Sequence, residues 1–271
     1  MKRKKFWIVL VSVLASLFVI VGGVYLLTKL GSVSVEFRTR LAQDETRLET
    51  GILDKVKESA EFDYKKSVLF INTKSNIAKI EKNNPYVKVQ QVLRKFPNKV
   101  CIYISERIPK YRIQDSESSD KWYILDDEFK VLECLTTAEL ESKSMQTKTV
   151  EVKYISEKTY VGDFLNNSAE LQKLNEITAG VYGKTKDYFV VSAIDYNKTS
   201  DTFTLTMKSG DINYEAGCEI EIIGSSNLKT KAYKATIVYT GTDDSLKNID
   251  LSKKVIIISD GNDCIIKKQE G

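Results

Sequence analysis

Residues 100–109 read Val-Cys-Ile-Tyr-Ile-Ser-Glu-Arg-Ile-Pro, and this stretch decides how the first half of the chain folds. Every second residue at its start is aliphatic, which is the period of a β-strand with one buried face. The aliphatic side chains are Val100, Ile102 and Ile104, and we expect Cys101, Tyr103 and Ser105 to face outward. A second strand is predicted at residues 87–93, and residues 94–99 then form a hairpin loop.

One strand and two helices are predicted before this hairpin. Residues 32–37 alternate as a strand does, and residues 45–62 place an apolar side chain at every fourth position, as an amphipathic helix does. A shorter helix is predicted over residues 73–82, between an N-cap at Asn72 and a stop at Pro85. The order strand, helix, helix, strand, strand predicts a small α/β domain with helices on one face of its sheet.

The N-terminal segment is predicted to be a membrane anchor. Residues 6–27 carry no charge, and as a helix they would rise about 33 Å, enough to cross the hydrocarbon layer. Four basic residues stand at positions 2–5, so we expect the N-terminus inside the cytoplasmic membrane and residues 30–271 outside. A cleaved signal peptide is the alternative, and the length of the apolar run favours the uncleaved anchor.

Charge and histidine content narrow the classes of function. The chain has 41 basic and 37 acidic residues, and all the basic excess lies in the first 28 residues, which argues against a nucleic-acid surface. With no histidine, Ser-His-Asp and Cys-His nucleophiles and HExxH zinc sites are excluded. An enzyme built on paired carboxylates or on lysine remains open.

The cysteines and the acidic run at residues 126–128 are not predicted to form sites. No CxxC motif is present, and two of the cysteines lie in strand-like runs, so we expect free thiols rather than two disulfides at Cys101, Cys134, Cys218 and Cys264. The acidic run lacks the ligand spacing of a calcium loop and is interpreted as a turn. The sequence predicts no catalytic residue, no metal site and no cofactor.

The second half of the chain is strand-rich. A hairpin is predicted from residues 122–125 and 130–132, and a helix at residues 165–180 with Gly180 near its end. Further strands are predicted at residues 189–196, 202–207, 218–223 and 255–259. Residues 227–239 are ambiguous between helix and strand, because their end is β-branched.

Three short motifs in order connect the chain to a known family. Asn84-Pro85-Tyr86-Val87, Arg94-Lys95-Phe96-Pro97 and Glu106-Arg107-Ile108-Pro109 resemble the POTRA domain of the bacterial cell division family FtsQ, also called DivIB. The chain departs from the family at Arg38-Thr39-Arg40-Leu41, where a Val-x-Gly-Asn-like turn is usual. The family also has a glycine in the turn near Phe129, and a helix where this chain has residues 227–239.

The resemblance implies an α+β fold in four parts. These are a cytoplasmic stub and transmembrane helix at residues 1–28, a POTRA domain at 29–110, a strand-rich β domain with helices at 111–260, and a short tail at 261–271. An adjacent acid and base at a strand end could form a catalytic pair, but for Glu106 and Arg107 a structural ion pair or a solvated edge is favoured. The resemblance implies a motif at the domain junction that comprises Arg94, Pro97, Glu106, Arg107 and Pro109.

The resemblance also implies a function: a non-enzymatic scaffold of the division machinery that links early and late septum proteins. Its expected partners are FtsB/DivIC-like and FtsL-like proteins, without nucleic acid or small-molecule substrate. From the residues alone, a buried central strand is slightly favoured over an open edge at residues 255–259, whereas the family position favours an edge that a partner strand extends. The partner-binding residues would be Val255, Ile256, Ile257, Ile258 and Ser259.

Two other functions remain compatible with the sequence. One is a membrane-anchored cell-wall enzyme that uses Asp or Glu, whose mark would be two converging carboxylates, one with a raised pKa. The other is a POTRA protein of a translocation or sporulation complex, which would keep the fold and change the partner.

Overall fold

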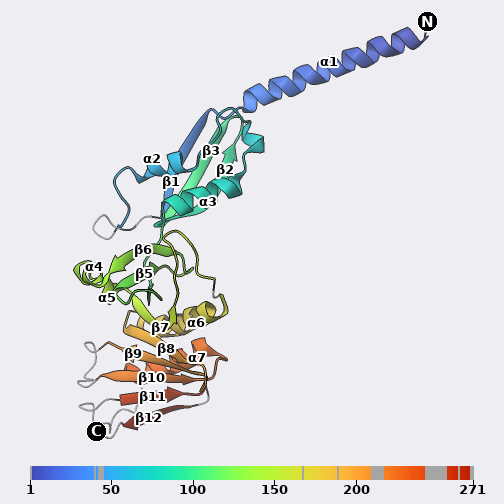
Figure 1. Ribbon diagram of the computed structural model, residues 1–271. Helices are drawn as coiled ribbons and strands as arrows, with labels where there is room; N and C mark the ends of the chain where they lie inside the picture. The colour runs from blue at the N-terminus through green and yellow to red at the C-terminus, as the bar shows by residue number, and fades with distance from the viewer. Residues whose placement is uncertain are drawn as a thin grey trace. The chain divides into compact units, whose positions relative to one another are not determined.

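A computed structural model describes residues 2–39, 41, 46–166, 168–187, 189–208, 217–241, 255–261 and 263–268. The chain forms two compact units, Met1–Arg107 and Ile108–Gly271 (Figure 1). The first unit ends three residues before the boundary expected from the sequence. The predicted α+β class is confirmed, since each unit combines helices with a sheet.

The first unit begins with the long helix α1, Lys2–Thr28. Its window Leu10–Thr28 has a mean hydropathy of 2.5, and apart from the buried Thr28 at its end its side chains are not packed inside the protein. By length and composition this helix is able to cross a membrane.

A three-stranded sheet follows α1 in the first unit. Its strands are β1 (Ser32–Thr39), β2 (Val87–Lys95) and β3 (Lys99–Glu106), with β3 in the centre, parallel to β1 and antiparallel to β2. The helices are α2 (Ile52–Ser59), the short 3-10 turn η1 (Val68–Phe70) and α3 (Thr73–Asn83). The predicted hairpin and the predicted second helix, with Asn72 as its N-cap, are confirmed.

One expectation for this unit was wrong. The helix predicted from residue 45 begins only at Ile52, because Gly51 has a φ of 80°, a left-handed conformation that a helix interior does not allow. Cys101 lies on the sheet face opposite to that of Val100 and Ile102, as predicted, since only the latter two belong to the core that contains the helices. It is nevertheless buried, with its Sγ 3.3 Å from a carboxylate oxygen of Glu36 on the neighbouring strand β1.

The second unit is built on one nine-stranded sheet with the order β12-β11-β10-β9-β8-β7-β4-β5-β6. The strands are β4 (Tyr111–Gln114), β5 (Lys121–Leu125), β6 (Val131–Thr136), β7 (Val150–Ser156), β8 (Val191–Asn197), β9 (Thr202–Met207), β10 (Cys218–Ile223), β11 (Val255–Ser259) and β12 (Cys264–Lys268). The helices are α4 (Thr137–Ser142), α5 (Met145–Lys148), α6 (Ser168–Thr185) and α7 (Leu228–Tyr239). The helix at residues 227–239 is therefore confirmed.

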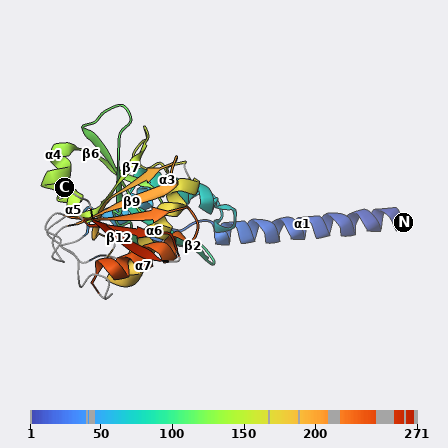
Figure 2. The ribbon, with the colours of Figure 1, turned by 90° about the horizontal axis from the view of Figure 1, so that it is seen from below.

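Helices cover both faces of this sheet. Side chains of α6 and α7 share the large core with strand residues such as Tyr123 and Leu125, whereas α4 and α5 pack with Ile124 of the same strand. Because neighbouring residues of a strand point to opposite faces, α4 and α7 lie on opposite sides of the sheet (Figure 2).

The acidic run at residues 126–128 forms a turn, as predicted. The Asp126 carboxylate accepts hydrogen bonds from the backbone N–H groups of Glu128 (2.9 Å) and Lys130 (2.8 Å). Phe129 occupies the position expected for glycine, with a φ of 62°. Its ring is buried and stacks on Tyr111 with centroids 5.3 Å apart, and this packing offsets the cost of the left-handed backbone.

Gly180 lies inside α6 and not near its end, because the helix continues to Thr185 and crosses α7 at this glycine. A Cβ atom at Gly180 would lie 2.3 Å from the Lys229 carbonyl oxygen and 2.8 Å from Cβ of Ala232. The backbones of the two helices approach closely here, and only glycine permits the contact.

Gly180→Ala is predicted to destabilise the α6–α7 pair by about 1–3 kcal/mol, because overpacking outweighs the gain in helix propensity. Gly183→Ala in the same helix is the matched control. There the added Cβ atom would meet only the Tyr233 ring, at 3.3 Å, so we expect little loss or a small gain. Hydrogen exchange of the α6 and α7 amides measures both effects, and equal exchange in the two variants would contradict the close-packing explanation.

A buried ion pair closes the far end of the first unit. The Arg107 guanidinium lies 3.2 Å from the Glu81 carboxylate, with side chains only 2% and 14% exposed. Glu81 also accepts a hydrogen bond from the Val89 backbone N–H (2.8 Å), and Arg107 donates one to the Val87 carbonyl (3.3 Å). The pair therefore joins the last turns of α3 to the start of β2.

Arg107→Met is predicted to destabilise the first unit by about 3 kcal/mol, because it leaves the Glu81 carboxylate mostly buried without its cation. Lys55→Met is the control, since it breaks an ion pair with Glu49 whose side chains are both more than half exposed, and it should cost less than about 1 kcal/mol. Hydrogen exchange of the β3 amides reports both changes. A similar small effect from both substitutions would show that burial of the Arg107 pair is of no consequence.

Candidate functional site

The strand predicted to be an open edge lies inside the sheet. β11 pairs in parallel with β10 on one side and antiparallel with β12 on the other. Val255, Ile257 and Ser259 are buried. The edge position expected for Val255, Ile256, Ile257, Ile258 and Ser259 was therefore wrong, because their backbone groups are already shared with two neighbours of the same chain.

The segment expected to be a short tail supplies the edge. Cys264–Lys268 forms β12, which returns antiparallel to β11 with Ser259 opposite Cys264 and Ile257 opposite Ile266. β12 is last in the sheet order, so among the described strands one row of its backbone groups has no sheet partner. Cys264 and Ile266 pack against the core, whereas Ile265 points away from it and is 55% exposed.

The turn that carries β12 is held by two lysines of α7. Lys234 donates a hydrogen bond from Nζ to the Gly261 carbonyl (2.9 Å). Lys231 is buried along its stem and donates to the carbonyls of Ile223 and Gly224, at the end of β10. Gly261 has a φ of 108°, and a Cβ there would lie 3.0 Å from Cε of Lys231. The helix thus positions the outermost hairpin, which no single motif in the sequence reveals.

The opposite edge of the sheet, at β6, is partly covered by a loop of the same chain. The Val131 N–H of β6 donates to the Asp163 carbonyl (2.9 Å), and the Val131 carbonyl accepts from the Gly162 N–H (2.8 Å). Lys130 forms an additional β-bridge with Phe164. The two ends of the sheet therefore differ: a loop occupies part of the β6 edge, and no described segment occupies the β12 edge.

The five residues expected at one domain junction fall at two ends of the first unit. Arg94 donates to the Ile71 carbonyl (2.8 Å) beside the β2–β3 turn that contains Pro97, at the end where α1 enters. Glu106, Arg107 and Pro109 lie at the other end, where the second unit begins. The junction assignment is therefore wrong for Arg94 and Pro97.

Glu106 and Arg107 have separate partners. The Glu106 carboxylate accepts hydrogen bonds from the Thr46 hydroxyl (2.8 Å) and the Arg47 backbone N–H (2.6 Å). It thereby fixes the segment before α2, while Arg107 pairs with Glu81. Arg107 is part of a structural ion pair, as predicted, but its partner is Glu81 of α3 and not the neighbouring Glu106.

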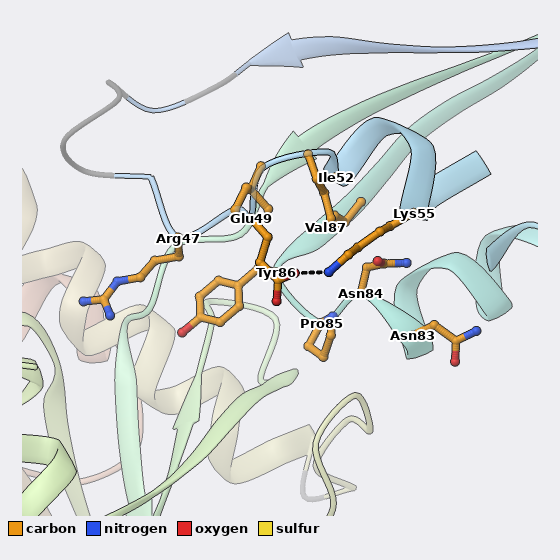
Figure 3. Close-up of a pocket in the computed structure, with 10 residues that line it drawn as sticks. Arg47, Glu49, Ile52, Lys55, Asn83, Asn84, Pro85, Tyr86 and Val87 are labelled. Carbon is orange, nitrogen blue, oxygen red and sulfur yellow. Dashed lines mark hydrogen bonds and ion pairs between the residues drawn. The ribbon is translucent and has the colours of Figure 1, made fainter. Parts of the chain in front are cut away.

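A pocket in the first unit lies between the start of α2 and the segment that follows α3 (Figure 3). Ile52 and Val87 provide buried apolar surface, and the Tyr86 ring stands beside them. Glu49, the only carboxylate among the described lining residues, is paired with Lys55. This pocket therefore lacks the two carboxylates that the enzyme hypothesis requires. A second pocket, in the second unit, is lined by two of them, Glu157 and Glu170, of which Glu170 is paired with Lys198.

The carboxyl groups with displaced pKa values also fail to support that hypothesis. Among the described residues, the pKa is lowered at Asp115, Glu139 and Asp201. Backbone N–H groups of Glu117 and Thr136 stabilise the first two carboxylates, and the hydroxyls of Ser225 and Tyr196 lower the pKa of Asp201. A general acid would need the opposite shift. All four cysteines are free thiols, as predicted.

Comparison with known proteins agrees with the motifs of the first unit. Residues 52–107 match the family described as POTRA domain, FtsQ-type. The chain is also 35% identical over 103 residues to the cell division protein DivIB of Clostridium tetani, an alignment that covers 38% of this chain and 34% of the relative. The match thus spans about a third of that relative's length. Together, these comparisons show that the first unit contains a POTRA domain of the FtsQ type and that about a third of the chain is similar to a DivIB protein.

Proposed function

We propose that the chain is a non-enzymatic scaffold of the division machinery that captures a partner by strand addition at the outer edge of β12. The observation that carries the proposal is the difference between the two edges of the nine-stranded sheet: a loop covers part of β6, and β12 ends the described strands. The relationship to DivIB supports the setting in cell division.

The chemistry of β12 suits this role. A partner strand would gain main-chain hydrogen bonds along residues 265–268, and its side chains would select the register. Ile265 offers an exposed apolar contact near the start of β12, in a strand that is otherwise fixed by β11 and the core. The expected partners are FtsB/DivIC-like and FtsL-like proteins, as the family resemblance implies.

The membrane helix completes the scaffold. We infer that α1 holds the chain in the cytoplasmic membrane with its N-terminus inside, because the basic residues at positions 2–5 precede the apolar window Leu10–Thr28. The two units would then lie on the outer side, where septum-building proteins act.

Ile265→Asp is predicted to weaken binding of the cognate DivIC-like partner at least about tenfold, because it replaces the exposed apolar contact of the added-strand interface with a charge. Ile223→Asp on β10 is the matched control, since Ile223 is also exposed, at 43%, but lies away from the sheet edge. Titration of the full chain in detergent with the purified partner gives both dissociation constants. Equal affinities of the Ile265→Asp variant and the unaltered chain would refute the β12 assignment.

Depletion of the protein should produce filaments without septa, because the scaffold would be missing from the division site. Fluorescence microscopy of membrane-stained cells checks this result, and re-expression of the Ile265→Asp variant should restore division less well than the Ile223→Asp variant. Normal septation after complete depletion would contradict the proposed role.

A further inference from the structure

Exposed apolar and basic side chains gather at the end of the POTRA domain where α1 enters. Phe70 and Phe96 are 72% and 73% exposed, and Leu69 and Tyr64 are 49% and 44% exposed. We define this anchor-end surface by Lys29, Tyr64, Lys65, Lys66, Leu69, Phe70, Arg94, Lys95, Phe96 and Lys99.

We propose that the anchor-end surface docks onto the outer face of the membrane and binds the headgroups of anionic phospholipids. This inference rests on the proposed insertion of α1 in the membrane, and adds a second, lipid-selective contact to it. It concerns no residue of the β12 edge.

The position of the surface relative to α1 places it at the membrane boundary. The Tyr25 hydroxyl donates to the Lys65 carbonyl (2.8 Å), and the Thr28 and Ser67 hydroxyls are hydrogen-bonded at 2.6 Å. Both α1 residues belong to the apolar window that ends at Thr28. Because a helix rises 1.5 Å per residue, the loop that carries Lys65 lies beside the last about 5 Å of that window. Leu69 and Phe70 follow within five residues, so they lie close to the same level.

The β2–β3 turn is joined to the same end. The Gly31 N–H donates to the Asn98 carbonyl (2.8 Å), three residues after the end of α1. Arg94 donates to the Ile71 carbonyl (2.8 Å), next to Phe70. Two segments distant in sequence therefore present Phe70 and Phe96 at one end of the domain.

The charge of this end is strongly one-sided. Residues 28–32, 63–71 and 94–99 contain six basic side chains and one acid, Asp63, which lies 3.9 Å from Lys66. Lys95 and Lys99 stand directly opposite each other on the antiparallel pair β2–β3, so that two basic residues flank the turn that carries Phe96.

Combined aromatic and basic character favours a lipid surface over a protein partner. Aromatic rings prefer the headgroup region, and lysine can bury its stem while its ammonium group contacts phosphate. The proposed membrane lies next to this surface, since only three residues separate the end of α1 from the first strand of the domain. Because the anchor-end surface directly follows α1, we identify the membrane that α1 crosses as the partner of this surface.

Hydrogen exchange of the full chain in lipid nanodiscs tests the proposal. We compare discs of phosphatidylcholine alone with discs that contain about one-third phosphatidylglycerol. Amides of residues 63–71 and 94–99 should exchange at least about threefold more slowly in the anionic discs. Equal exchange of these amides in the two membranes would overturn the proposal.

Two double variants separate the contribution of the basic side chains to membrane contact from that of the apolar side chains. Lys65→Glu/Lys66→Glu should abolish the dependence on phosphatidylglycerol, and Leu69→Ser/Phe70→Ser should reduce protection in both discs. The charge-matched control is Lys57→Glu/Lys82→Glu, at exposed positions of α2 and α3 away from this end, and the apolar control is Tyr160→Ser/Val161→Ser in the second unit. If a control pair removes the protection as fully as its test pair, the assignment to the anchor-end surface is wrong.

Alkaline extraction of membranes distinguishes this inference from the proposed anchoring. A chain that stays in the membrane pellet but exchanges alike in both discs would sink the lipid contact alone. A chain released by alkali would contradict both the anchor and the docking that depends on it.

Discussion

A strand at the end of a sheet has one row of backbone N–H and C=O groups that no neighbour satisfies, and this constraint organises the second unit. At β6 a loop of the same chain satisfies part of this row, because the backbone groups of Val131 are hydrogen-bonded to Gly162 and Asp163. At β12 no further described strand follows, although Lys234 of α7 holds the turn at Gly261. This difference between the two edges is the basis of the proposed strand addition at β12.

The parts of the fold that follow from local pattern were predictable. The period of two in residues 87–104, the cap at Asn72 and the stop at Pro85 all act within a few residues, and the structure contains the corresponding strands and helix. Helix α2 was predicted too long because Gly51 was treated as a tolerated helical residue, whereas the chain uses it as a left-handed cap. Gly180 was misplaced because its role depends on α7, which lies about 50 residues further along.

The candidate site shows more clearly that local sequence pattern does not reveal contacts between distant segments. The all-apolar stretch of β11 is compatible with both an edge and a central strand, and what decides between them is whether another segment pairs beyond it. The stretch Cys264-Ile265-Ile266 is short and does not alternate clearly between apolar and polar residues, so its pattern does not predict β12. The partner of Arg107 was hidden for a related reason: Glu81 lies 26 positions earlier, and only the packing of α3 against β2 brings the two together. Charge, by contrast, could have indicated the anchor-end surface, since in the sequence lysines stand close to both Phe70 and Phe96.

The parallel pairing of β10 with β11 has a consequence for the position of the outermost hairpin. Parallel neighbours need a crossover, and here the crossover contains α7, which packs on α6. β12 in turn pairs only with β11 among the described strands. The place of the β11–β12 hairpin in the sheet is therefore coupled to the packing of the two helices, so that a change at the α6–α7 contact acts on the last strand without touching it.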